Sequence, residues 1–217
     1  MSEDWFPLIT TATRETLMMV LIAMAVTIPF GLALGVLLLI TGRAQILEQP
    51  VAHRVLGAIV NVGRSVPFII LLVAVIPLTR ALVGTTIGTT AAIVPLALAT
   101  IPFFARIVET ALREVPGGLV EAALASGARR RDVVTKVLIP EALPSLVAGV
   151  TITTIGVLGY SAMAGAVGGG GLGDVAIRYG YQRYETSITV ATVVVLVVLV
   201  QVLQFLGDRL ARRLSHT

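Results

Sequence analysis

Long apolar stretches alternate with short polar segments along the whole chain, and this pattern predicts membrane-spanning helices. Five stretches stand out, at about residues 17–40, 55–78, 87–105, 143–167 and 188–207. Each is close to the roughly 20 residues that a helix needs to cross a bilayer. The fifth is rich in valine, but a lone strand in lipid would leave its backbone unpaired, so helix is favoured there too. We expect an all-α integral membrane protein with five transmembrane helices.

The second stretch is the least regular of the five. Its clean apolar part, residues 66–78, is too short to span a membrane, so the helix must extend back through Asn61 to about residue 55. This extension places Arg64 within the span or at its edge. In the first stretch, Gly31 and Gly35 are four residues apart, the spacing of small residues that lets two membrane helices approach closely.

The composition agrees with this pattern. Charged residues make up 13% of the chain, against roughly 25% in soluble domains. This excludes a soluble enzyme and a disordered chain, and the absence of cysteine excludes disulfides and thiolate sites. The net charge of +4 does not indicate nucleic-acid binding, because Lys136 is the only lysine and the arginines are scattered between apolar runs.

Positive residues between the stretches predict the orientation in the membrane. Eleven fall on one side and four on the other. The richer side is expected to be cytoplasmic, so the N-terminus faces out and the C-terminus faces in. We therefore expect an extracytoplasmic segment at residues 1–13, a membrane domain at 14–208 and a cytoplasmic tail at 209–217. The longest loop, about residues 106–142, faces the cytoplasm.

This loop is expected to be ordered rather than irregular. Residues 119–126 favour a short helix, and Gly127 stands where a helix-ending glycine would stand. A second short helix is expected over about residues 130–138, with Pro140 ending it. Such a compact knob favours docking of a partner. The alternative is a hairpin lying on anionic lipid headgroups through Arg129, Arg130 and Arg131.

The residues of this loop resemble the EAA motif of ABC importer permeases. Glu121-Ala122-Ala123 is followed after three residues by Gly127 and after nine more by residues 137–140, Val-Leu-Ile-Pro, where the motif has Ile-x-Leu-Pro. The resemblance implies that Glu121, Ala122 and Ala123 lie on a coupling helix that inserts into a groove of a cytoplasmic ATPase. It also implies that Gly127 makes the turn and that Pro140 ends the second helix.

Further stretches resemble the permease of methionine-import ABC transporters, at residues 61–72, 91–96, 140–144, 159–168, 170–173 and 204–209. This resemblance implies a type I importer permease fold in a bacterial cytoplasmic membrane. It implies a homodimer with two ATP-binding subunits and an extracytoplasmic methionine-binding protein or lipoprotein. The chain would then be a transport subunit and not an enzyme, with no cofactor of its own, since ATP and Mg would bind the ATPase.

Three polar residues near the second stretch are candidates to line the translocation path, namely Asn61, Arg64 and Ser65. A central arginine costs on the order of 2.5–3.5 kcal/mol to insert, so it should face the helix bundle or a wet cavity. In the alternative, Arg64 snorkels to the cytoplasmic headgroups while Asn61 bonds a neighbouring helix.

The glycine-rich end of the fourth stretch is a candidate gate. Tyr160 and Ser161 would supply polar atoms, and Met163 would supply a flexible apolar closure between two copies of the chain. The alternative is ordinary packing of small residues. Gln201 and Gln204, three apart on the fifth stretch, are expected to bond neighbouring helices.

Several other functions compete with methionine import. An importer of another amino acid would share these features, whereas an importer of quaternary-ammonium osmolytes would favour an aromatic cage, for which the chain has few aromatic residues. A membrane enzyme would need paired intramembrane acids or a metal-binding motif. A channel would not need the knob.

Overall fold

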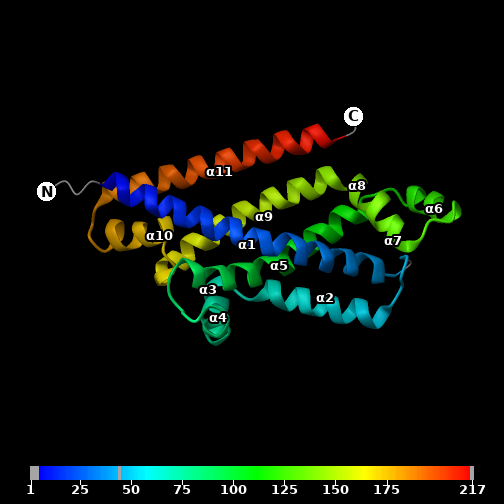
Figure 1. The fold of residues 1–217 in the computed structure, drawn as a ribbon, viewed down its shortest axis with the longest axis horizontal. Helices are drawn as coiled ribbons and strands as arrows, with labels where there is room; N and C mark the ends of the chain where they lie inside the picture. Colours follow the sequence, from blue (N-terminus) through cyan, green and yellow to red (C-terminus); the bar gives the residue numbers. More distant parts are fainter. Residues whose placement is uncertain (1–4, 44, 216–217) are drawn as a thin grey trace.

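The computed structural model describes residues 5–43 and 45–215, and within these ranges the chain is helical with no strand. The long helices lie roughly along one axis, with the N-terminal end of the chain and helix α6 at opposite ends of the molecule (Figure 1). The helices are α1 (Trp5–Thr41), α2 (Pro50–Ser65), α3 (Phe68–Ala74), α4 (Ile76–Val83), α5 (Thr89–Arg113), α6 (Gly117–Ala125), α7 (Arg130–Val133), α8 (Ile139–Glu141), α9 (Leu143–Ala164), α10 (Gly171–Val175) and α11 (Thr186–Leu214). Three π-helical segments are η1 (Val134–Leu138), η2 (Gly165–Gly169) and η3 (Ala176–Tyr181).

Helices α1 and α5 form the centre of the bundle because small residues let them approach closely. A Cβ atom added to Gly35 would lie 2.5 Å from Cβ of Val108, and one added to Gly31 would lie 2.7 Å from the ring of Phe104. Both glycines face α5, as their spacing predicts. A buried hydrogen bond of 2.7 Å between the hydroxyls of two threonines, one on each helix, joins the pair further along (Thr27 and Thr100).

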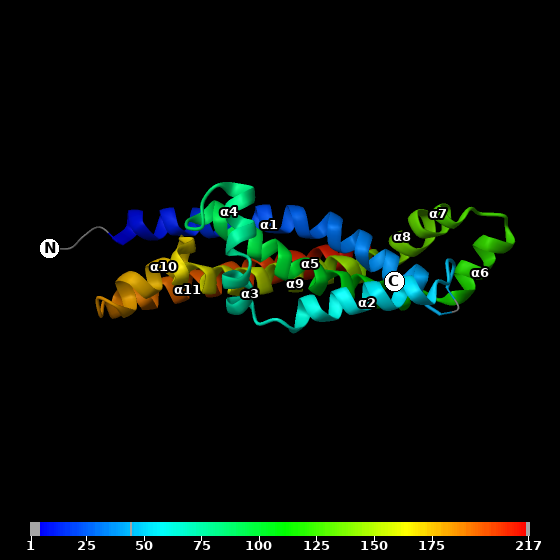
Figure 2. The same ribbon diagram turned by 90° about the horizontal axis from the view of Figure 1, so that it is seen from below.

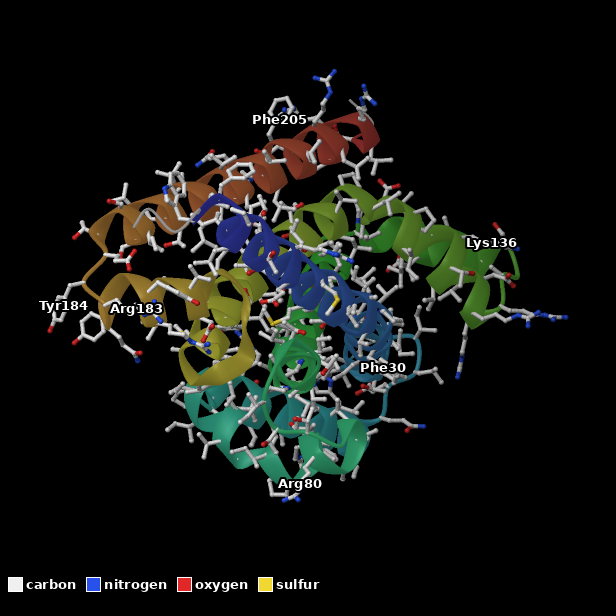
Figure 3. The ribbon with its side chains drawn as sticks, turned by 60° about the vertical axis from the view of Figure 1, so that its left-hand side comes forward. Phe30, Arg80, Lys136, Arg183, Tyr184 and Phe205 are labelled. Carbon is white, nitrogen blue, oxygen red and sulfur yellow. The ribbon has the colours of Figure 1, made fainter. Side chains whose placement is uncertain are left out.

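Four of the five predicted spans coincide with a long apolar helix. These are α1, α5, α9 with η2, and α11, each long and apolar enough to cross a membrane. The valine-rich segment is helical, as expected. Among its exposed apolar side chains, Phe205 is 59% exposed and points away from the bundle (Figure 3). Phe30 on α1 is 64% exposed. An apolar exterior of this kind is suited to lipid.

The second predicted span is not one straight helix, and this expectation is corrected. The chain bends by 103° between α2 and α3, so the two together are either a broken span or a re-entrant loop. The cause is local: Pro67 disfavours helical geometry at the residue before it, and Val66 is extended with φ −83° and ψ 122°. Helix α4 then lies across the bundle, as Figure 2 shows.

The long helices also exceed the predicted spans. Helix α1 begins at Trp5 rather than near residue 17, α5 continues to Arg113 where a loop was expected from residue 106, and α11 continues to Leu214. Polar residues at a helix end keep their backbone hydrogen bonds outside the apolar layer, so apolar composition underestimates helix length. Of the predicted terminal segments, residues 1–4 and 216–217 lie outside the described residues.

Candidate functional site

The expected knob is present at the end of the molecule opposite the N-terminus (Figure 1). Helix α6 ends in a hydrogen-bonded turn in which the Gly127 amide donates to the Leu124 carbonyl at 3.0 Å and the Ala128 amide donates to the Ala123 carbonyl at 3.1 Å. This is the Schellman arrangement, which needs a left-handed residue, and Gly127 has φ +81°. The prediction that Gly127 makes this turn is confirmed.

Helix α6 carries Glu121, Ala122 and Ala123 and has no buried residue. Its apolar side chains Leu119 and Leu124 are each 42% exposed. Val120 packs, partly buried, against the apolar cluster around Leu112 and Leu138, but a nine-residue helix with so little packing gains little stability from its own chain, since short isolated helices are marginal in water. This exposed apolar and small-residue surface is therefore suited to a groove on another molecule. The Glu121 side chain lines a cavity of about 510 Å³ between α6 and the C-terminal ends of α1 and α5.

The expectation that Pro140 ends the second helix of the knob is wrong. Helix α7 passes into the π-helical segment η1, and Pro140 follows inside α8. In a π-helix each amide bonds to the carbonyl five residues back instead of four. The amide that a proline lacks therefore falls at a different place in the hydrogen-bond pattern than in an α-helix. The chain turns instead at Ala142, whose amide still donates to the Leu138 carbonyl at 3.0 Å.

One ion pair orders the outer face of this second helix. The Lys136 ammonium lies 3.0 Å from a carboxylate oxygen of Asp132. Its hydrogen bond lowers the pKa of the Asp132 carboxyl below the ordinary value. Both side chains are on the surface, so the pair orients the helix without contributing much stability. Figure 3 shows Lys136 projecting from this end of the molecule.

A charged network that the sequence pattern did not single out lies near the C-terminal end of α5. The buried Glu109, 2% exposed, accepts from Arg106 at 2.6 Å and from Arg113 at 2.5 Å. Arg106 also donates to the side-chain oxygen of Asn61 on α2 at 2.7 Å. Asn61 therefore bonds a neighbouring helix, and Ser65 donates back to the Asn61 carbonyl at 2.7 Å. The arginines stand three and four residues from Glu109, a spacing visible in the sequence.

Arg64 lies apart from this network, although it follows Asn61 by one helical turn. Its guanidinium carbon is 5.9 Å from the centre of the Phe103 ring on α5. With α5 and α9, Arg64 lines a cavity of about 340 Å³ that also includes Arg106, Glu114 and Ser145. The structure thus brings Arg64 and Asn61 to the same part of the molecule but gives them different partners.

The predicted gate residues divide between buried and exposed positions. Ser161 is 1% exposed and its hydroxyl donates to the Leu158 carbonyl at 2.7 Å, so it is held within its own helix. The Tyr160 ring stacks on Phe68 of α3, with centroids 4.9 Å apart. Met163 is 50% exposed. Of the three, Met163 is the one whose side chain is free to meet another molecule.

The glycine-rich segment after Met163 folds back against α9. A Cβ atom added to Gly173 would lie 2.2 Å from the Ala162 carbonyl oxygen, so these glycines serve close packing of backbone on backbone. A carboxylate that the sequence analysis passed over holds the turn: Glu15 of α1 accepts from the Gly171 amide at 2.8 Å. The neighbouring Thr16 hydroxyl accepts from the Leu172 amide at 2.9 Å.

The glutamines of α11 do not behave as expected. Gln204 donates to Asp208 of the same helix at 2.7 Å rather than to a neighbouring helix. Gln201 lines an apolar groove of about 370 Å³ between α9 and α11.

Comparison with known proteins places these features in context. Residues 28–216 match the family model described as binding-protein-dependent transport system inner membrane component. The chain is 56% identical to a probable D-methionine transport system permease protein MetI of Vibrio cholerae, over 98% of this chain and 96% of that protein. It is 51% identical to the probable D-methionine permease MetI of Pasteurella multocida, over 96% of each. Among solved structures, an inward-facing MetNI methionine ABC transporter matches with a TM-score of 0.97 and 49% identity over the whole of both chains.

Proposed function

The chain belongs to the family of binding-protein-dependent transport system inner membrane components, and from this membership we propose that it is the membrane permease subunit of an ATP-driven methionine importer. The observation that carries the proposal is the whole-length match, with a TM-score of 0.97, to a methionine ABC transporter in an inward-facing conformation. The chain itself does no chemistry in this proposal, since ATP and Mg bind a separate ATPase.

The knob is the coupling element of this permease. Glu121, Ala122 and Ala123 lie on the exposed helix α6 and enter a groove of the ATPase, and Gly127 holds the angle to the second helix. Pro140 stands within that second helix near its return to the membrane domain. Rigid turns of this kind can carry a rigid-body motion of the ATPases into the membrane helices.

Two copies of the chain with two ATPases and an extracytoplasmic methionine-binding protein form the transporter. Five spans, with the broken pair α2–α3 counted as one, put the N-terminus outside and the C-terminus in the cytoplasm of a bacterium. The distribution of arginine supports this orientation. The position of α6 at the end opposite the N-terminal end of α1 is consistent with it (Figure 1).

The translocation path runs between the two copies along an uncovered face of α9. Met163 forms the closure near the outer end, and Tyr160 and Ser161 hold the helix behind it. On the inner half, Asn61, Arg64 and Ser65 border the path. Arg64 lies against the Phe103 ring and lines a cavity with α5 and α9, which favours the path over snorkelling to the headgroups.

The proposal is tested by reconstituting the chain with its cognate ATPase in liposomes and measuring uptake of labelled methionine. Uptake should require ATP and the binding protein. Glu121→Gln or Gly127→Val should abolish stimulation of ATP hydrolysis by the loaded binding protein, whereas Glu141→Gln, on an exposed acid of α8 at the membrane end of the knob, should not. Normal coupling in the first two variants would remove the coupling assignment.

The substrate is tested separately. Isothermal titration of the cognate binding protein with a panel of amino acids should show the tightest binding for methionine. Binding of a different amino acid instead would replace the substrate and keep the permease. The stacked arrangement of Phe68 and Tyr160 turns their faces toward each other, which does not suit a cage for a quaternary ammonium ion.

A further inference from the structure

The cavity between α2, α5 and α9 has the size and the lining of a ligand site. Its volume of about 340 Å³ is at the lower end of the roughly 300–1,000 Å³ typical of small-molecule pockets. Apolar side chains cover much of its wall, among them Phe103, Ile107 and Ile152. Polar groups stand at its two ends, with Arg64 beside Phe103 and Glu114 beside Ser145.

The charges at these ends are not neutralised by the protein. Among the described residues, Arg64 has the Phe103 ring as its contact and no hydrogen-bond or ion-pair partner. Glu114 accepts one long hydrogen bond of 3.5 Å from Ser145 and has no ion pair. Arg106, the third charged group on the wall, is already held by Glu109 and Asn61. The cavity therefore presents one available cation and one available anion that do not pair with each other.

The depth of Arg64 in the membrane limits the groups that can stabilise its charge. Its partner Phe103 lies 14 residues after the start of α5 and three before Arg106, toward the C-terminal end of the apolar part of a candidate span. A guanidinium at this depth is stable only where it faces water or a counter-charge. Glu114 directly follows α5, on the cytoplasmic side of Arg64. Phe103 and Glu114 are 11 residues apart along α5, about 16 Å, so a zwitterion whose carboxylate binds Arg64 would meet Glu114 as a long-range charge that attracts its ammonium group.

The cavity also opens on the face of α9 along which the translocation path is proposed to run. One face of α9 carries four residues that recur at helical spacing, namely Ser145, Ile152, Gly156 and Met163. Ile152 is 55% exposed and Met163 is 50% exposed, and a Cβ atom added to Gly156 would meet nothing within 4 Å. This face is uncovered from the cavity to the proposed closure, so a solute passing Met163 would reach Arg64 without leaving it.

We propose that this cavity, here called the inner subsite, binds the transported amino acid as a zwitterion with an apolar side chain before its release to the cytoplasm. The inference rests on the proposed function and adds a site to it. Arg64 is the carboxylate-binding residue, Glu114 attracts the ammonium group, and the wall around Phe103 and Ile152 receives the side chain.

The test uses the assembled permease and ATPase in nanodiscs without the binding protein, observed by saturation-transfer difference NMR, which detects weak ligands. Three probes separate the two charges: methionine, methylthiobutanoate without the ammonium, and methylthiopropylamine without the carboxylate. Arg64→Gln should weaken methionine and methylthiobutanoate by about tenfold to a hundredfold, the usual effect of losing a hydrogen bond to a charged group. It should leave the amine unaffected. Glu114→Gln should show the opposite selectivity with a smaller effect.

Matched variants keep the test interpretable. Arg80→Gln removes the same charge from α4, outside the cavity, and should change none of the three ligands. Arg64→Lys keeps the charge and should retain part of the methionine signal, which shows that loss in Arg64→Gln is not a folding defect. Signal from any site on the ATPase is common to all variants and cancels in the comparison.

Two results would overturn the inner subsite. One is equal methionine binding by Arg64→Gln and wild type, and the other is an absence of methionine signal in a wild-type complex that imports methionine. Both leave the proposed function in place, because uptake by the same wild-type preparation is measured with ATP and binding protein. Failure of that uptake would instead remove the proposed function.

Discussion

Replacing Glu109 with glutamine removes a negative charge that two arginines share near the C-terminal end of α5. The Glu109 side chain is 3% exposed, and it accepts from Arg106 at 2.6 Å and Arg113 at 2.5 Å. Glutamine has nearly the same shape, so the change leaves packing intact and isolates the electrostatic contribution. The glutamine keeps one carbonyl oxygen, which can accept from one arginine. Its NH2 group faces the other arginine, and because both groups are hydrogen-bond donors, no hydrogen bond forms between them.

The size of the effect follows from how exposed each arginine is. Arg113 is 64% exposed, so its pair contributes about 0–1 kcal/mol. Arg106 is 30% exposed, and its charge-assisted hydrogen bond contributes about 1.5–3 kcal/mol. Glu109→Gln should therefore destabilise the protein by about 2–4 kcal/mol. At about 2–4 °C per kcal/mol for a chain of this size, the apparent melting temperature should fall by about 5–15 °C.

The assay is thermal unfolding of the purified transporter at one fixed scan rate, since unfolding of membrane complexes is generally irreversible. Glu141→Gln is the matched control, because it removes one charge from an exposed acid and should stay within about 0.5 kcal/mol of wild type. In a double-mutant cycle with Arg106→Gln, the shifts in apparent melting temperature should be less than additive, because both variants break the same pair. Equal melting temperatures for Glu109→Gln and Glu141→Gln would refute the reasoning.

Three further substitutions test other parts of the structure. Gly127→Ala places a side chain at φ +81°, so it should destabilise the turn by about 1–2 kcal/mol and reduce ATPase coupling. Gly118→Ala, at a position with open space, should do neither. Equal ATPase rates for the two variants would contradict this. Gly35→Leu should separate α1 from α5 and lower the yield of assembled transporter on size-exclusion chromatography, while Gly57→Ala, which meets nothing within 4 Å, should be neutral. Glu15→Ala should release the α10 turn and speed hydrogen exchange of its amides, and unchanged exchange would show that the carboxylate does not hold it.

Features that depend on nearby residues could be predicted from the sequence. The Gly127 turn needs only a short helix and a glycine after it. The break of the second span also has a local cause in Pro67, although one continuous helix was expected there. The spacing of Gly31 and Gly35 predicted close approach to another helix, but not that this helix is α5. In each case the cause lies within one or two helical turns of the residue concerned.

Features that depend on distant residues could not be predicted. Glu15 bonds an amide 156 residues away, and no local pattern links the two. Ser161 was expected to supply a polar atom at a gate, yet it is buried, because which face of α9 is covered depends on how the other helices pack. Glu109 carried a local signal in its two arginines, yet it lay where apolar composition ended and a loop was expected. Pro140 was misjudged because a π-helical register cannot be seen in sequence.

The continuity of α5 has a mechanical consequence. Its 25 residues run without interruption through Pro95 and Pro102, where two backbone hydrogen bonds are missing. The closely packed α1 supports α5 along this stretch and keeps it straight. At one end the Gly88 amide donates to the Gly168 carbonyl at 2.9 Å, and at the other the chain passes through Pro116 into α6. At about 1.5 Å per residue this is a lever arm of about 37 Å, so a tilt of about 10° at the knob would displace the glycine turn behind Met163 by about 6 Å.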